Sequence, residues 1–154
     1  MGENQMELIQ SEEKLEDITG LNCIYVPVSD VYESVQWYQK NLGCVPTPNH
    51  PVKPGMKHSI MRFPDSNGKT RGAGLRSTVP ALFLVESGDR LGFTNYHGAR
   101  TPVGSFTTPR IQELYNRFKE NGVNVAGEIP EGRECGPNLQ FYDPDGNLWE
   151  IWQP

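Results

Sequence analysis

At 154 residues the chain has the length of one domain, enough to bury a sizeable core. Hydrophobic residues make up 36% and charged residues 21%, with 16 Gly and 13 Pro, which is typical of a globular, loop-rich protein and excludes a disordered one. The formal net charge of −5 argues against a nucleic-acid-binding surface. No apolar run approaches the roughly 20 residues of a membrane-spanning helix.

The N-terminal residues 1–17 are polar and acidic, the opposite of a signal peptide. We therefore predict an acidic tail over residues 1–18 and a single domain over residues 19–154. The three cysteines, Cys23, Cys44 and Cys135, are odd in number and contain no CxxC pair. Free thiols in the cytoplasm are the simplest interpretation, because disulfides are rare in that reducing compartment.

The first half of the chain predicts a strand, a helix and further strands. The helix is expected over residues 31–41, since Asp30 and Glu33 form a capping-box-like pair and Gly43 suits a left-handed stop. A long loop follows over residues 65–80. The predicted strands of this half are residues 21–28, 58–63 and 81–86.

The second half follows the same plan. Its helix is expected over residues 109–121, with Thr108 as the cap, Pro109 in the first helical position and Gly122 as the stop. Residues 143–147 contain a Pro and a Gly at turn positions, so they predict a hairpin turn. The predicted strands are residues 103–107, 123–126, 139–142 and 148–152.

An offset of 80 residues relates the two halves. It pairs Ile111 with Val31, Glu113 with Glu33, Tyr115 with Val35, Phe118 with Tyr38 and Asn121 with Asn41. Any two amphipathic helices share some likeness, but the common order of elements and the matched Glu and Asn favour a duplication. We predict two βαβββ modules, at about residues 19–90 and 100–154.

Three segments then resemble the vicinal-oxygen-chelate superfamily, the glyoxalase, bleomycin-resistance and extradiol-dioxygenase group. These are residues 28–43, 111–123 and, most specifically, the sequence Asp-Pro-Asp-Gly-Asn-Leu-Trp-Glu at residues 143–150. The resemblance implies an α+β fold in which two tandem βαβββ modules form a cupped, barrel-like mixed sheet with the helices outside. It also implies a small organic ligand and a possible homodimer.

The resemblance further implies metal-ligand positions, which this chain largely lacks. Cys23, Val103 and Leu84 (or a neighbour of Leu84) stand where the family often has ligands, and Glu150 alone matches. His97 could join Cys23 and Glu150 only if its segment folded back into the cup. Neither His50 nor His58 forms a ligand pair. Because a divalent centre needs about three protein ligands, we expect no metal and no other cofactor.

Glu150 is the candidate catalytic or anchoring residue. It alternates with Leu148 and Trp152, so these three side chains should share the face that the resemblance turns into the cup. There Glu150 could act as a base or a binding carboxylate. The alternative is a structural carboxylate paired with an arginine such as Arg62.

The candidate ligand-binding residues are mostly aromatic: Cys23, Tyr25, Phe83, Tyr96, His97, Phe106, Phe141 and Trp152. Such rings can enclose a planar or apolar ligand, although packing between helix and sheet would use the same residues. Cys23 is either a nucleophile or a small buried hydrophobe. Lys69, Arg71 and Arg76 of the long loop either close over an anionic ligand or are solvated.

The function predicted from these residues is a metal-free small-molecule-binding protein of the cytoplasm, with no nucleic-acid or membrane partner. The first alternative is a lyase, isomerase or dioxygenase with an atypical metal site that uses Glu150. A second alternative is an interaction domain whose cup is filled by its own side chains, because a fold does not fix a function.

Overall fold

The computed structural model of the protein describes residues 17–18, 20–64, 79–129 and 136–154. The predicted tail and the cationic loop residues Lys69, Arg71 and Arg76 fall largely or wholly outside these ranges. In the described part, no helix is long and apolar enough to cross a membrane.

Two βαβββ modules form the body, as predicted. The first consists of β1 (Cys23–Val28), α2 (Val31–Leu42), β2 (Val45–Pro46), β3 (His58–Arg62) and β4 (Ala81–Glu86). The second consists of β7 (Gly104–Thr107), α3 (Ile111–Glu120), β8 (Asn124–Val125), β9 (Asn138–Tyr142) and β10 (Leu148–Trp152). Between them runs a hairpin that the sequence did not predict, formed by β5 (Phe93–Thr94) and β6 (Arg100–Thr101).

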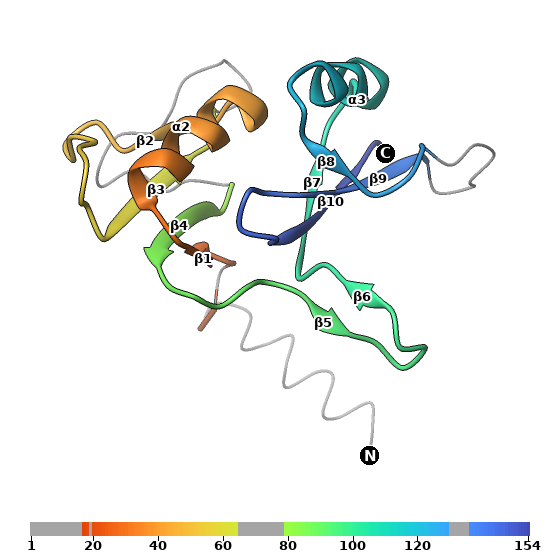
Figure 1. The fold of residues 1–154 in the computed structure, drawn as a ribbon, viewed down its shortest axis with the longest axis horizontal. Coiled ribbons are helices and arrows are strands. Elements are labelled where there is room, and N and C mark those ends of the chain that lie inside the picture. Colours follow the sequence, from red (N-terminus) through yellow and green to blue (C-terminus); the bar gives the residue numbers. More distant parts are fainter. Residues whose placement is uncertain (1–16, 19, 65–78, 130–135) are drawn as a thin grey trace, which may run out of the picture.

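Each module has its own four-stranded mixed sheet with the same topology. The strand orders are β1-β4-β3-β2 and β7-β10-β9-β8, with β1 parallel to β4 and β7 parallel to β10. The predicted single cupped sheet is thus two sheets that are not closed into a barrel. The sheets lie side by side with both helices on one side, and the β5–β6 hairpin lies on the other (Figure 1).

Helix α2 begins and ends as the sequence indicates. The Asp30 side chain accepts a hydrogen bond from the Glu33 backbone N–H, and Gly43 ends the helix at φ 75°. The predicted start of α3 is wrong, because the helix begins at Ile111 rather than at Pro109. The Thr108 hydroxyl accepts from the Arg110 N–H at 3.1 Å, and the Ile111 N–H, which has no acceptor within the helix, donates to the side chain of Gln153 at 2.8 Å.

One apolar core continues through both modules. Val26, Leu84 and Val35 fill it from the first module, and Phe118 and Phe141 from the second. Two residues related by the offset of 80 meet at the C-terminal ends of the two helices. Asn121 donates to the side chain of Asn41 at 3.1 Å, as expected of equivalent residues beside an approximate twofold axis.

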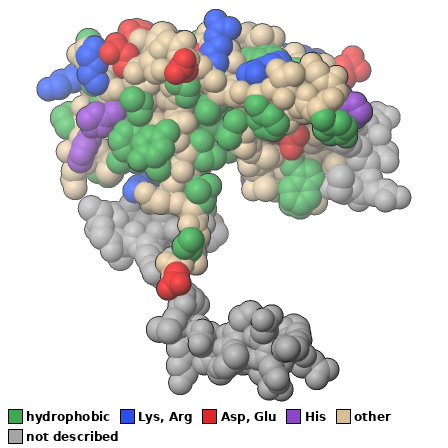
Figure 2. Space-filling view, turned by 90° about the horizontal axis from the view of Figure 1, so that it is seen from below, with side chains coloured by type: hydrophobic (Ala, Val, Ile, Leu, Met, Phe, Trp, Pro, Cys, Tyr) green, Lys and Arg blue, Asp and Glu red, His purple; other side chains and the backbone are tan. Residues whose placement is uncertain are grey.

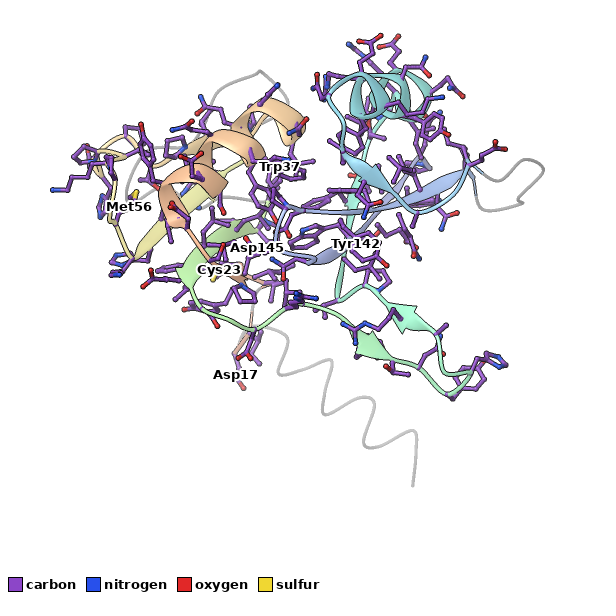
Figure 3. All side chains as sticks on the ribbon, viewed as in Figure 1. Asp17, Cys23, Trp37, Met56, Tyr142 and Asp145 are labelled. Atoms are coloured by element: carbon purple, nitrogen blue, oxygen red, sulfur yellow. The ribbon has the colours of Figure 1, made fainter. Side chains whose placement is uncertain are left out.

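A buried polar network joins the modules at the end of β1. The Tyr38 hydroxyl donates to the Asp143 carboxylate at 2.6 Å and accepts from the Trp149 indole N–H at 2.9 Å. Asn147 donates to the same carboxylate at 2.6 Å and to the Pro27 carbonyl at 2.7 Å. These bonds connect α2 and β1 of the first module to the turn before β10. Figure 3 shows Trp37 and Asp145 at this junction.

Burial governs the acidity of the groups in and near this network. It raises the pKa of the Tyr38 hydroxyl well above its ordinary value, and the charge of Asp143 adds to that effect. Burial also raises the pKa of the Asp143 carboxyl, while hydrogen bonds from Tyr38 and Asn147 oppose the shift. Nearby, burial raises the pKa of the Cys44 thiol to about 12, so Cys44 stays protonated and unreactive at neutral pH.

Replacing Asp143 by Asn should destabilise the fold. The Asp143 carboxylate also accepts from the backbone N–H groups of Asp145 and Asn147, so all its partners are donors. In either orientation the side-chain NH2 of the introduced amide would face a hydrogen-bond donor, which should lower the free energy of unfolding by about 1–3 kcal/mol. Urea unfolding measures this loss. The exposed control Asp89→Asn should stay within about 0.5 kcal/mol of the unmodified protein, and equal stability of the two variants would contradict the role given to Asp143.

Candidate functional site

Glu150 lies on the face of the second sheet that points away from α3. Its neighbours Trp149 and Ile151 are 0% and 1% exposed in the core, so alternation turns Glu150 and Trp152 to the open face. Leu148 is 2% exposed and thus closed off from solvent, although it shares their parity. The face opposite the helices shows many hydrophobic side chains, with charged ones mostly toward its edges (Figure 2).

Neutral donors from the two neighbouring strands hold both oxygens of Glu150. The Ser105 hydroxyl of β7 donates to Oε1 at 3.0 Å, and the Asn138 amide of β9 donates to Oε2 at 3.1 Å. Ser105 stands opposite Glu150 in the parallel β7–β10 register. No ion pair with Arg62 forms: over the described ranges the salt bridge found is Lys57–Glu86. The Glu150 charge is therefore oriented but not neutralised by a described cation.

A cavity of about 420 Å³ lies between the two sheets; Ser105 is among its lining residues, and Glu150 is not. Its walls are mainly apolar, and the Ser105 and Thr107 side chains add hydroxyl groups. Ser105 therefore borders the cavity and also contacts Glu150. The main apolar wall residues are Ile24, Phe63, Leu82, Phe106 and Trp149.

Aromatic contacts keep the wall of the cavity in place. The Phe106 ring lies 4.8 Å from the Trp149 ring and 5.5 Å from the Phe63 ring, centroid to centroid. Gly104 lets the β7 backbone lie close to the Trp149 ring and to Ile24, because a Cβ there would stand 2.7 Å from the Trp149 ring and 3.3 Å from the Ile24 side chain. A flat apolar molecule could lie against these rings.

A second group of rings occupies the open face of the first sheet. Tyr25 and Phe83 are cross-strand partners with centroids 5.0 Å apart, and His58 stacks on Phe83 at 5.7 Å. The Tyr25 side chain is 63% exposed. Cys23, the labelled sulfur on β1 in Figure 3, is a half-buried free thiol on the same strand.

The remaining predicted site residues lie elsewhere. Phe141 is 0% exposed and packs in the core against Phe118. Tyr96 and His97 form the turn of the β5–β6 hairpin, where Tyr96 is 92% exposed. The structure thus brings Tyr25 and Phe83 together, whereas Phe106 pairs with Ile151 in the β7–β10 register and turns to the opposite face of its strand from Ser105.

Sequence reasoning missed Ser105, Asn138, Phe63 and His58. Ser105 could have been found from its equivalence to Tyr25 under the offset of 80, since both face outward beside the last strand of their module. The same register shows that Phe83, the neighbour of Leu84, is the first-module equivalent of Glu150. Leu84 itself is fully buried in the core.

The donors around Glu150 do not fit a resident divalent metal. A hydroxyl and an amide stand beside the single carboxylate, whereas stable sites use about three carboxylate, imidazole or thiolate ligands. Among the described residues, no group of three or more His, Cys, Asp or Glu side chains lies close enough together to hold a metal ion.

Fold and site together define a class: paired βαβββ modules with an open face and a cavity between the sheets. The family profile of the glyoxalase/bleomycin resistance protein/dioxygenase superfamily matches residues 20–151, and the chain belongs to this superfamily. No match to a curated protein was found.

Three solved structures illustrate the likeness. The fosfomycin resistance protein FosX from Listeria monocytogenes, complexed with Mn(II) and 1S,2S-dihydroxypropylphosphonic acid, has a TM-score of 0.60 at 21% identity, covering 88% of this chain and 92% of that one. TioX from Micromonospora sp. ML1 has a TM-score of 0.60 at 14% identity, with coverage of 88% and 98%. TnmS3, an antibiotic-binding protein from Streptomyces sp. CB03234, has a TM-score of 0.58 at 22% identity, with coverage of 91% and 99%. At these identities the likeness shows the fold.

The close approach of Gly104 to the Trp149 ring can be tested by substitution. Gly104→Ala should lower the free energy of unfolding by about 1–3 kcal/mol, because the new methyl group overpacks the Trp149 ring. Gly88→Ala is the matched control, since a Cβ there meets nothing within 4 Å. Thermal unfolding of the two variants measures the difference, and an unchanged Tm for Gly104→Ala would mean that the Trp149 ring does not lie this close to β7.

Proposed function

We propose that this protein binds a small aromatic molecule carrying a cationic or hydroxyl group, without help from a metal. The observation that carries the proposal is that Ser105 both lines the apolar cavity and donates a hydrogen bond to the Glu150 carboxylate. A ring in the cavity would contact Phe106 and Trp149, while its polar group reaches Glu150. The carboxylate would then gain a charged or donating partner, which stabilises the complex.

Two of the similar structures give this proposal a context. TnmS3 is described as an antibiotic-binding protein, and FosX as a fosfomycin resistance protein. By analogy the ligand of this chain is a small organic molecule, and the aromatic walls favour a planar one over a phosphonate. The proposal includes a cytoplasmic location, which agrees with the free thiols of Cys23 and Cys44, and a homodimer, as the family resemblance suggests.

Replacing Glu150 by Gln tests the polar anchor. The change keeps the size of the side chain and removes its charge, so binding of thioflavin T, a planar aromatic cation, should weaken by about 1–3 kcal/mol. Binding of the anionic dye 1-anilinonaphthalene-8-sulfonate should not weaken. Dye fluorescence titrations give both affinities. Glu113→Gln on the solvent side of α3 is the control and should change neither. Equal losses for both dyes, or a large fall in Tm with unchanged affinities, would make Glu150 a structural residue.

The enzyme alternative requires a metal site that Glu150 completes with atypical ligands. We expect protein purified without added metal to contain much less than one equivalent of Zn, Ni, Mn or Fe, because the donors near Glu150 are neutral. Inductively coupled plasma mass spectrometry measures the content. If each chain holds one ion tightly and the Glu150→Gln variant loses it, the binding proposal is wrong and the enzyme alternative takes its place.

A further inference from the structure

The charge of this protein is concentrated at its N-terminus. Residues 1–17 carry a formal charge of −5, which equals that of the whole chain, and residues 18–154 hold 13 acidic and 13 basic residues. The charged residues of the N-terminal segment are Glu3, Glu7, Glu12, Glu13, Lys14, Glu16 and Asp17. The rest of the chain therefore has no net charge, so it does not repel this acidic segment overall.

The hairpin has the opposite character. Residues 90–101, which are the hairpin and the segment that leads into it, contain Arg90, Arg100 and His97 and no acidic residue. In the described part of the protein, none of these three side chains forms an ion pair. The hairpin thus offers positive charge to a partner that is acidic.

The hairpin turn presents its aromatic side chains in a fixed geometry. Asn95 accepts hydrogen bonds at its side-chain oxygen from the N–H groups of His97 and Ala99, at 2.9 and 3.1 Å. Gly98 adopts φ 79° and donates to the Asn95 carbonyl, which closes the turn. Tyr96 stacks on His97 with centroids 4.0 Å apart, although it is 92% exposed. An ordered and exposed aromatic tip is typical of a contact surface.

Most of the exposed large apolar side chains in the described residues lie on two segments, the chain entry and the hairpin with its flanks. They are Ile18, Leu21, Tyr25, Phe93, Tyr96 and Val103, and Val79 before β4 lies outside these segments. Asp17, where the described chain starts, lies on the same side of the body as the hairpin (Figure 3). A 16-residue segment attached there reaches up to about 50 Å when extended.

We propose that the acidic segment of residues 1–16 docks on the basic β5–β6 hairpin of its own chain. Its carboxylates meet Arg90, Arg100 and His97, and its apolar residues cover the exposed Tyr96 and Phe93. The short connection at Asp17 gives the segment a high effective concentration at the hairpin, which favours its own chain over a second copy. The charge pairs lie at the surface, so added salt weakens the docking.

Photo-crosslinking in the full-length chain tests this docking. Tyr96 is replaced by the photo-reactive p-benzoylphenylalanine, and mass spectrometry maps the products. We expect links to residues 1–16 at the mass of one chain, with a yield that falls about fivefold in the triple variant Glu12→Lys, Glu13→Lys, Glu16→Lys. The double variant Glu113→Lys, Glu120→Lys, with both changes on the exposed side of α3, should not alter the yield.

The same probe at Gln112, on the exposed side of α3, controls for random collisions and should give few links to residues 1–16. Links that appear at twice the chain mass would assign the hairpin to a second copy and overturn the proposal. Equal yields from Tyr96 and Gln112, or a yield unaffected by reversing the tail charges, would also overturn it. Circular dichroism confirms that each variant keeps its fold. The ligand proposal is independent of these outcomes.

Discussion

The architecture depends on the buried carboxylate of Asp143. Among the described strands no β-ladder joins the two sheets, so the modules are held by core packing and by hydrogen bonds, of which those around Asp143 are more buried than those to Asn41. Asn147 extends the network to the Pro27 carbonyl at the end of β1 and accepts from the Leu91 N–H at 2.6 Å, which also fixes the chain that leads into the hairpin. A satisfied polar network in a low-dielectric interior specifies one arrangement of its elements, because any shift leaves a donor or acceptor unpaired.

The position of this network explains where the cavity lies. At the end of β1 the two modules are joined by hydrogen bonds. Asn147 donates to the Pro27 carbonyl, and Asp145 accepts from the Ser29 N–H. The cavity lies at the start of the same strand, beside Ile24. Because the turn fixes the distance between the modules at the end of β1, their distance at the start of β1 depends on the size of the side chains between them. There the Trp149 ring and the Ile24 side chain lie against Gly104, and the Phe106 ring lies 4.8 Å from the Trp149 ring, so these side chains line that end of the space between the sheets.

Local signals in the sequence predicted the modules, and long-range pairing accounts for what they missed. The cap at Asp30, the stop at Gly43 and the turn at residues 143–147 are each determined by a few adjacent residues, so they could be recognised. The bond between Tyr38 and Asp143 spans 105 positions and follows from no local pattern. Partners of Glu150 depend on strand register, which the turn and the core fix only after folding. The very short β5 and β6 strands give too little alternation to be detected.

The duplicated halves have diverged at equivalent positions, and this difference bears most directly on function. The register pairs Tyr25 with Phe83 in the first sheet and Ser105 with Glu150 in the second. One open face therefore offers rings, and the other offers an oriented carboxylate. The aromatic pair supplies no carboxylate, imidazole or thiolate that could complete a divalent centre together with Glu150. The proposed ligand, with an apolar ring and a cationic or hydroxyl group, would use both faces, because each half would then contact the chemistry that it can stabilise.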